Sequence, residues 1–219
     1  MNAAPLTTAG ARPRLQRGLY AITPDWSDTA RLLATTDAIL AGGCRLLQYR
    51  NKIASPELQR EQTEALRTLT RRHGVPLIIN DDAALALAVE ADGAHIGRDD
   101  GAITEARALL GTNALLGASC YNEHVRAETA AAAGADYVAF GAMFTSPTKP
   151  QAVRAPLELI GQARALGRPI VCIGGITAEN AAPLIAAGAD LLAVISDVFD
   201  APDPHARAAQ FAALFETVS

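Results

Sequence analysis

The sequence is poor in aromatic residues and cysteine, and it contains no long hydrophobic run. No apolar stretch approaches the roughly 18 residues that a membrane-spanning helix needs, which argues against an integral membrane protein. Aromatic side chains make up 5% of the 219 residues, although 50% of the residues are hydrophobic and alanine is abundant. This composition is typical of helices with small side chains that pack on a central sheet.

Cysteine is scarce, and the three cysteines, Cys44, Cys120 and Cys172, lie far apart without a CxxC pair. This spacing argues against disulfides and against a structural zinc site, and it favours reduced thiols. We therefore expect a cytoplasmic protein. None of the three has an evident histidine partner in the sequence. We therefore interpret them as small buried residues rather than nucleophiles.

No strong charge excess is present, since 19 lysines and arginines face 23 acidic residues, for a net charge of -4. This balance argues against non-specific binding to nucleic acid or to a membrane surface. Residues 1–17 are rich in Ala, Thr, Pro and Arg but lack the apolar core of a secretory signal, so we expect a mobile N-terminal arm. Residues 18–219 contain no linker and are expected to form one domain. The sequence is compatible with a homo-oligomer of this domain.

Short β-branched or apolar runs alternate with alanine-, leucine- and charge-rich helical stretches along the whole domain. The expected strands are 18–22, 45–50, 76–79, 94–96, 115–119, 137–140, 170–173 and 191–195. The expected helices are 28–41, 56–73, 83–90, 104–110, 123–133, 156–166, 178–187 and 204–217. Eight such units favour a closed α/β barrel, the (β/α)8 or TIM barrel. An open doubly wound sheet usually has about five strands, and no GxGxxG follows the first strand here.

The strongest functional signal is a glycine pair, Gly174-Gly175, at the end of the seventh expected strand. The eighth expected strand ends at Ile195-Ser196. Exposed backbone N–H groups at two neighbouring strand ends can bind a phosphate, because glycine lets the backbone come close. In TIM barrels such a site commonly follows strands 7 and 8, so the sequence predicts a phosphorylated ligand.

Polar and cationic residues end the second expected strand. With a period of two, Gln48 and Arg50 share the face that we expect to point into the barrel, and Lys52 follows just above. This arrangement suits an anionic substrate at the carboxyl ends of the strands, where TIM barrels have their active sites. The alternative is a solvated charge cluster on a loop.

Two aspartates follow neighbouring strands, Asp81 after the third and Asp100 after the fourth. Mg²⁺ is commonly bound by one or two carboxylates together with substrate phosphates and water, which fits this pair. The alternative is helix capping, by Asp81 or Asp82 before one helix and by Asp99 or Asp100 before the next.

The loop after the sixth expected strand carries Ser146, Thr148 and Lys149, hydroxyl and ammonium groups that suit phosphate or pyrophosphate. A plain Ser/Thr/Pro loop is the alternative. Ser119 ends the fifth strand and is either a ligand contact or a helix cap. His95 alternates with apolar neighbours, so we interpret it as a packed barrel histidine rather than a catalytic one.

Taken together, these strand ends resemble those of the thiamine-phosphate synthase family, from about Leu19 to the end of the chain. The matching segments are QYRNK at 48–52, ND at 80–81, GAHIGRDD at 93–100, GAS at 117–119, 141–149, IGGIT at 173–177 and AVIS at 193–196. Each motif is weak alone, but the whole set in this order is specific.

The resemblance implies a reaction in which hydroxymethylpyrimidine diphosphate loses pyrophosphate and a thiazole phosphate nitrogen captures the pyrimidine methylene. It implies that the diphosphate is bound by Arg50, Lys52, Asn80 and Lys149, with Gln48 nearby. It further implies Mg²⁺ as cofactor on Asp81 and Asp100, and Ser119 near the pyrimidine. The thiazole phosphate would be held by Ser146, Thr148 and the backbone N–H groups of Gly175, Ile195 and Ser196.

Two positions depart from the family pattern: Arg98 stands where glutamine is common, and Thr145-Ser146 stands where Pro-Thr is usual. Arg98 adds a charge near the expected metal, whereas Ser146 keeps a hydroxyl. Two other functions compete with a synthase. A related thiazole tautomerase would not need the diphosphate site, and a non-catalytic sensor of phosphorylated ligands would bind without turnover.

Overall fold

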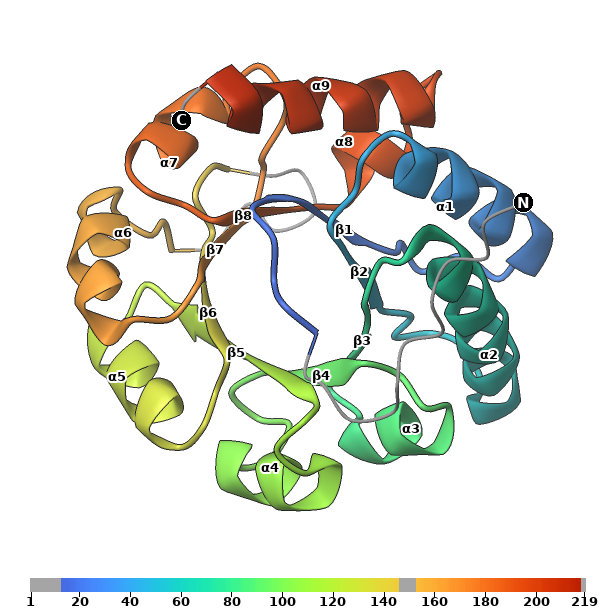
Figure 1. The fold of residues 1–219 in the computed structure, drawn as a ribbon, viewed down its shortest axis with the longest axis horizontal. Helices are drawn as coiled ribbons and strands as arrows, with labels where there is room; N and C mark the ends of the chain where they lie inside the picture. Colours follow the sequence, from blue (N-terminus) through green and yellow to red (C-terminus); the bar gives the residue numbers. More distant parts are fainter. Residues whose placement is uncertain (1–12, 146–152, 218–219) are drawn as a thin grey trace, which may run out of the picture.

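The computed structural model of the chain describes residues 13–145 and 153–217. Within these residues eight parallel strands close into a barrel in the order of the sequence, as Figure 1 shows. The strands are β1 (Gly18–Ile22), β2 (Leu46–Tyr49), β3 (Leu77–Asn80), β4 (Gly93–Ile96), β5 (Leu115–Tyr121), β6 (Tyr137–Phe140), β7 (Ile170–Ile173) and β8 (Leu191–Val194). The predicted TIM barrel is confirmed.

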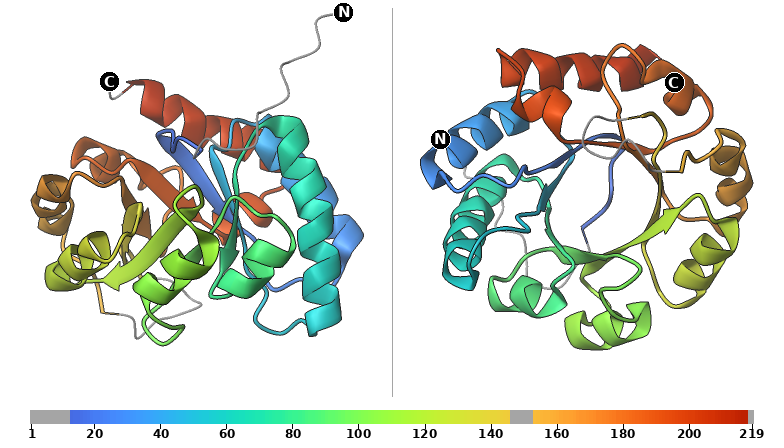
Figure 2. Two further views of the ribbon diagram at one scale, coloured as in Figure 1. Left: turned by 60° about the horizontal axis from the view of Figure 1, so that its bottom comes forward. Right: turned by 180° about the vertical axis from the view of Figure 1, so that it is seen from behind.

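The helices surround the barrel as an outer ring, which the two views of Figure 2 show from other sides. They are α1 (Thr29–Ala41), α2 (Pro56–His73), α3 (Ala83–Ala88), α4 (Ile103–Leu110), α5 (His124–Ala132), α6 (Glu158–Ala163) with the 3₁₀ turn Arg164–Leu166, α7 (Ala182–Ala186), α8 (Ser196–Phe199) and α9 (Pro204–Thr217). The last helix, α9, packs beside α1 and completes the ring (Figure 1). In the described part of the chain, none of these helices is both long and apolar enough to cross a bilayer.

Burial divides the hydrophobic residues into two cores. A larger core lies between the strands and the surrounding helices, and a smaller one fills the inside of the barrel. Tyr20 and Tyr137 are the largest side chains of the inner core and meet edge to face, with ring centroids 6.0 Å apart. Gly117 makes room for them, because a Cβ at this position would run into the ring of Tyr137. The inside of the barrel is therefore packed by aromatic side chains that a neighbouring glycine accommodates.

A repeated aspartate explains the Gly-Ala-Asp and Ala-Asp-Gly segments at the starts of β4, β6 and β8. Each aspartate accepts a backbone N–H from the start of the preceding strand. The distances are 2.8 Å for Asp92 with Leu77, 2.8 Å for Asp136 with Leu116 and 2.9 Å for Asp190 with Ile170. Arginines from the outer helices pair with two of them, at 2.6 Å in both cases, Arg67 with Asp92 and Arg107 with Asp136. These charge-assisted bonds satisfy N–H groups at the amino-terminal rim of the barrel.

Residues 13–17 lead from the N-terminal segment into β1. Leu15 packs against the inner core, and Arg17 lies 3.8 Å from the carboxylate of Asp190. The predicted mobile arm covers residues 1–17, and its first twelve residues lie outside the described part of the chain.

Two elements near the C-terminus differ from the sequence prediction. The helix expected over 178–187 is shortened to α7, because Asn180 binds the backbone N–H of Thr177 and the carbonyl of Gly175 and so forms a turn first. The short helix α8 begins directly after β8 and was not predicted. By contrast, α2 begins as expected, with Ser55 as N-cap and Pro56 in the first turn.

Candidate active site

Five of the predicted site residues lie at the carboxyl end of the barrel, on or just after β2, β3 and β5: Arg50, Lys52, Asn80, Asp81 and Ser119. Parallel strands in a barrel present their carboxyl ends at one rim, so these groups share one face of the molecule. The contacts among them, described next, show which side chains are brought together.

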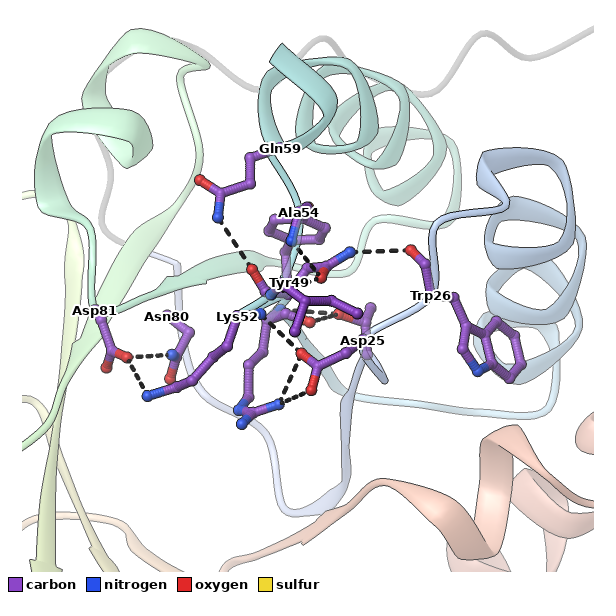
Figure 3. Close-up of polar contacts among 12 residues, drawn as sticks. Asp25, Trp26, Tyr49, Lys52, Ala54, Gln59, Asn80 and Asp81 are labelled. Atoms are coloured by element: carbon purple, nitrogen blue, oxygen red, sulfur yellow. Dashed lines mark hydrogen bonds and ion pairs between the residues drawn. The ribbon is translucent and has the colours of Figure 1, made fainter. Parts of the chain in front are cut away.

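Arg50 is held by an aspartate that the sequence did not single out. Its Nη1 lies 3.0 Å from both carboxylate oxygens of Asp25, in the loop between β1 and α1. The same carboxylate accepts the backbone N–H of Lys52 at 2.8 Å, and Thr23 binds the backbone of Arg50 through its hydroxyl. Figure 3 shows Asp25 beside the segment that carries Lys52. One carboxylate therefore orients the guanidinium and the turn that follows it.

Lys52 reaches across to the end of β3. Its Nζ lies 3.1 Å from Oδ2 of Asp81, and the side-chain amide of Asn80 donates to the same oxygen at 2.6 Å (Figure 3). More than half of the lysine side chain, 56%, is exposed, so the ammonium is accessible to a ligand. The ammonium of Lys52, which follows β2, and the amide of Asn80 from β3 thus stand beside the Asp81 carboxylate.

Helix capping does not explain Asp81 or Asp100. Asp82 is the N-cap of α3 and accepts the N–H of Leu85 at 2.7 Å, whereas Asp81 takes a left-handed backbone conformation with φ 63°. Ala102 is the N-cap of α4, without a side-chain capping bond. Of the aspartates considered as caps, Asp82 alone has this role. A left-handed conformation is uncommon for a residue other than glycine, and it aims the Asp81 side chain at the rim.

Asp81 and Asp100 form a pair of carboxyl groups at the ends of β3 and β4. Gly97 lies against both, since a Cβ there would overlap Oδ2 of Asp100 and come within 3.7 Å of Oδ1 of Asp81. Partial burial, and then the neighbouring Asp81 carboxyl, raise the pKa of Asp100 above its usual range. A divalent cation bound by both carboxylates would relieve this repulsion, and their oxygen donors are of the kind that Mg²⁺ takes. Among residues 13–145 and 153–217 no cluster of three or more His, Cys, Asp or Glu could hold a metal.

A buried amide network supports the Arg50–Lys52 segment from behind. Gln62 of α2 is fully buried, and its Oε1 accepts from the Tyr49 hydroxyl at 2.8 Å and from the Asn51 amide at 3.1 Å. Both amide groups also donate to the carbonyl of Trp26, at 3.0 Å from Gln62 and 2.9 Å from Asn51. Figure 3 labels two of the residues that take part, Tyr49 and Trp26. The network ties α2, β2 and the loop after β1 together and fixes the segment that carries both cations.

A second buried network crosses the inside of the barrel. The Nε2 of Gln48 lies 2.6 Å from the Tyr20 hydroxyl, which lies 2.8 Å from the hydroxyl of Tyr137. The Tyr137 hydroxyl lies 3.2 Å from Nδ1 of His95, whose Nε2 lies 2.9 Å from Oγ of Ser119. Burial lowers the pKa of His95 to about 4, so the ring is neutral at pH 7. The expected packed barrel histidine is confirmed, and it joins Gln48 to Ser119, two predicted site residues.

The glycine pair after β7 lies against the loop that follows β6. Gly175 has φ 63°, and a Cβ there would come within 2.6 Å of the carbonyl oxygen of Thr145. The N–H of Phe144 donates to the carbonyl of Gly174 at 2.9 Å. Ile195 and Ser196 follow β8 and begin α8. The predicted ligand residues Ser146, Thr148 and Lys149 lie outside the described residues.

Arg98, the charge that departs from the family pattern, is paired with Glu123 and stacks on the ring of Tyr121, with its guanidinium carbon 4.7 Å from the centroid. Its charge is therefore balanced by a carboxylate at the end of β5 rather than left free beside Asp100.

A closed eight-stranded barrel with cations and a carboxylate pair at its carboxyl rim defines a TIM-barrel protein with a site suited to an anionic ligand. The family model described as thiamine monophosphate synthase matches residues 19–198. The chain belongs to this family.

Relatives of known name agree with the family. A thiamine-phosphate synthase of Azoarcus sp. (strain BH72) is 63% identical over 200 residues, which are 91% of this chain and 97% of the relative. One from Aromatoleum aromaticum is 56% identical over 201 residues, 91% of this chain and 97% of the relative. The solved structure of thiamine phosphate pyrophosphorylase from Pyrococcus furiosus superposes with a TM-score of 0.83 at 32% identity, over 93% of this chain and 98% of that one.

Proposed function

We propose that the protein joins hydroxymethylpyrimidine diphosphate to a thiazole phosphate and forms thiamine phosphate with release of pyrophosphate. The observation that carries the proposal is the contact of Lys52 with Asp81, at the same rim as the Arg50–Asp25 pair, so that cations and carboxylates are offered together. A diphosphate with its divalent cation needs this combination, and membership of the family supports the reaction. We also propose a cytoplasmic location, which the three free and buried cysteines support.

Departure of pyrophosphate builds negative charge on the leaving oxygens, and the chain offers cations for it. In this proposal Arg50, Lys52, Asn80 and Lys149 bind the diphosphate, and Asp81 and Asp100 hold Mg²⁺. The bound metal supplies further charge stabilisation for the leaving group. Asp25 and the amide network around Gln62 hold Arg50 and Lys52 in place beforehand, which limits the reorganisation needed during the reaction.

The pyrimidine of the diphosphate substrate is proposed to lie near Ser119 and Gln48. Its electron-rich ring stabilises the cation that develops on the attached methylene group. The protein then positions two bound substrates and excludes water. This chemistry needs no side-chain nucleophile. Burial raises the pKa of the Cys44 thiol to about 11 and those of Cys120 and Cys172 to about 12, which supports a structural role for the cysteines.

The thiazole phosphate is proposed to bind at the neighbouring rim, between the ends of β6, β7 and β8. Ser146 and Thr148 would donate hydroxyl hydrogen bonds, and Gly175, Ile195 and Ser196 would donate backbone N–H groups. The carbonyls of Phe144 and Thr145 occupy the position that a Gly175 side chain would take, so the loop after β6 lies directly beside the end of β7, as a site shared by the two would require.

The test mixes the purified protein with both substrates and Mg²⁺ and measures thiamine phosphate and pyrophosphate. Equal amounts of the two products are expected, and removal of Mg²⁺ by a chelator is expected to stop the reaction until Mg²⁺ is restored. Binding of thiazole phosphate without product would contradict the proposal and favour the tautomerase or the sensor. An assay of thiazole isomerisation in the same sample separates these two.

A further inference from the structure

We infer that the hydrogen-bond chain inside the barrel fixes the tautomer of His95 and thereby makes the Ser119 hydroxyl a hydrogen-bond donor toward the substrate site. Tyr137 is then a positioning residue, since it acts on the substrate through His95 and Ser119. The catalytic part of this inference rests on the proposed function. The tautomer itself does not, because it is a property of the protein without substrate.

The direction of hydrogen-bond donation through the network follows from Gln48, its first residue. The Nε2 group of Gln48 is an amide NH₂, which only donates, and it lies 2.6 Å from the Tyr20 oxygen. Tyr20 uses its oxygen as the acceptor there, so its own hydroxyl hydrogen is free to point at the oxygen of Tyr137, 2.8 Å away. Tyr137 has then accepted one bond and has its own hydrogen to donate.

The acceptor for that hydrogen is Nδ1 of His95, at 3.2 Å. The two rings also stack, with centroids 5.6 Å apart and an interplanar angle of 28°, which holds the imidazole in this orientation. A neutral imidazole with an unprotonated Nδ1 carries its hydrogen on Nε2. Nε2 therefore donates to Oγ of Ser119 at 2.9 Å.

Ser119 consequently accepts a hydrogen bond from His95. Its own hydroxyl hydrogen remains for an acceptor on a ligand. The ligand group that fits is a lone pair on a heteroaromatic ring nitrogen, such as a pyrimidine presents. With the opposite tautomer, Ser119 would have to donate to Nε2 and would offer only a lone pair to the ligand.

Burial protects this order from water. Tyr20, Gln48, Tyr137 and His95 are exposed by 1%, 3%, 0% and 7%. Without solvent to supply alternative partners, each group bonds to its neighbours in the network, so loss of the Tyr137 hydroxyl removes the donor at Nδ1 of His95.

The first test is ¹⁵N NMR of the histidine side chains in the wild-type protein without substrate, with the His95 signals assigned from a His95→Gln sample. We expect a protonated Nε2 and an unprotonated Nδ1. Tyr137→Phe removes the hydroxyl that donates to Nδ1 of His95, so a mixture of the two tautomers is expected. Tyr20→Phe is the matched control, because it removes an equally buried hydroxyl but leaves Tyr137 able to donate to His95. In that variant the wild-type tautomer is expected to persist.

The second test is kinetic. We expect kcat to fall about tenfold in Tyr137→Phe, the change that corresponds to one hydrogen bond of about 1.4 kcal/mol, with a smaller loss in Tyr20→Phe. In a Ser119→Ala background the extra loss from Tyr137→Phe is expected to disappear, because the hydroxyl that it orients is gone.

A protonated Nδ1 in the wild-type protein, or an unchanged tautomer in Tyr137→Phe, would overturn the inference. Undiminished loss in the Ser119→Ala background would overturn its catalytic part. If the protein made no thiamine phosphate, the proposed function would fail while the NMR result still decided the tautomer. The wild-type spectrum also decides it if Tyr137→Phe does not fold.

Discussion

Replacing Asp25 by alanine tests whether Arg50 and Lys52 depend on a carboxylate that is not itself expected to touch substrate. In the structure the guanidinium of Arg50 is fixed by two contacts of 3.0 Å, and the N–H of Lys52 by one of 2.8 Å. In Asp25→Ala the arginine side chain regains up to about 2 kcal/mol of rotamer entropy, which substrate binding then has to remove. Loss of the N–H bond to Lys52 adds about 1 kcal/mol.

A second effect favours substrate binding, because Asp25→Ala also removes a negative charge near the negatively charged diphosphate. For charges about 8 Å apart in water, this relief amounts to about 0.5 kcal/mol per charge pair, and physiological salt screens it further. Three negative charges on the diphosphate give about 1.5 kcal/mol of relief in total, against about 3 kcal/mol from loss of order, so loss of order outweighs relief of repulsion by roughly 1.5 kcal/mol. We expect kcat/KM for the diphosphate substrate to fall about tenfold.

The assay is steady-state synthesis of thiamine phosphate at saturating thiazole phosphate, with the melting temperature measured in parallel. Asp25→Asn is the matched control, since it keeps an oxygen for the N–H of Lys52 but loses the charge that holds Arg50, and an intermediate rate is expected. The melting temperature should change little, because partly exposed ion pairs contribute about 1 kcal/mol or less. A kcat/KM equal to or above that of the wild type in Asp25→Ala would refute the reasoning.

Three further variants and one labelling experiment test other parts of the account. Asp100→Asn is expected to raise the Mg²⁺ concentration needed for half-maximal rate at least tenfold, whereas the neighbouring Asp99→Asn should not; equal behaviour of the two would remove the metal assignment. Gln62→Leu removes the acceptor of the Tyr49 hydroxyl and one of the two acceptors of the Asn51 amide, so we expect the free energy of unfolding to fall by about 2–3 kcal/mol in a urea titration, and an unchanged midpoint would show that the network contributes little. Lys149→Ala should lower turnover far more than thermal stability, and a wild-type rate would make the loop after β6 an ordinary connection. At pH 8 a thiol reagent should label the native protein at least a hundredfold more slowly than the urea-unfolded chain, because burial raises the pKa of each thiol, and fast labelling of the native protein would contradict the burial of Cys44, Cys120 and Cys172.

The barrel could be predicted because its signals are local. Alternation of β-branched runs with alanine-rich helices gave eight units, and the described residues contain eight strands in these places. The start of α2 was also predictable, since the N-cap Ser55 and Pro56 are adjacent in sequence. The short helix α8 was missed because Ser196 to Phe199 form less than two turns and lack a capping side chain.

The site residues could be proposed from their positions after strands, whereas their partners could not. Asp25 looks like any polar residue in a loop, and its contact with Arg50 depends on how the loop after β1 folds across the rim. Gln62 belongs to a largely polar helix, and only the packed structure shows that it is fully buried. Tyr137 looked like an ordinary strand residue, although its hydroxyl links Tyr20 to His95 inside the barrel. Such contacts join residues distant in sequence and leave no periodic signal.

In the proposed function one rim of the barrel binds the diphosphate and its cation together. The most direct measurement is a crystal structure of the protein with pyrophosphate and Mn²⁺, which stands in for Mg²⁺ and gives an anomalous signal. We expect one anomalous peak between the carboxylates of Asp81 and Asp100, with pyrophosphate oxygens on Arg50 and Lys52. Pyrophosphate bound elsewhere, or a metal peak away from both aspartates, would contradict the proposal.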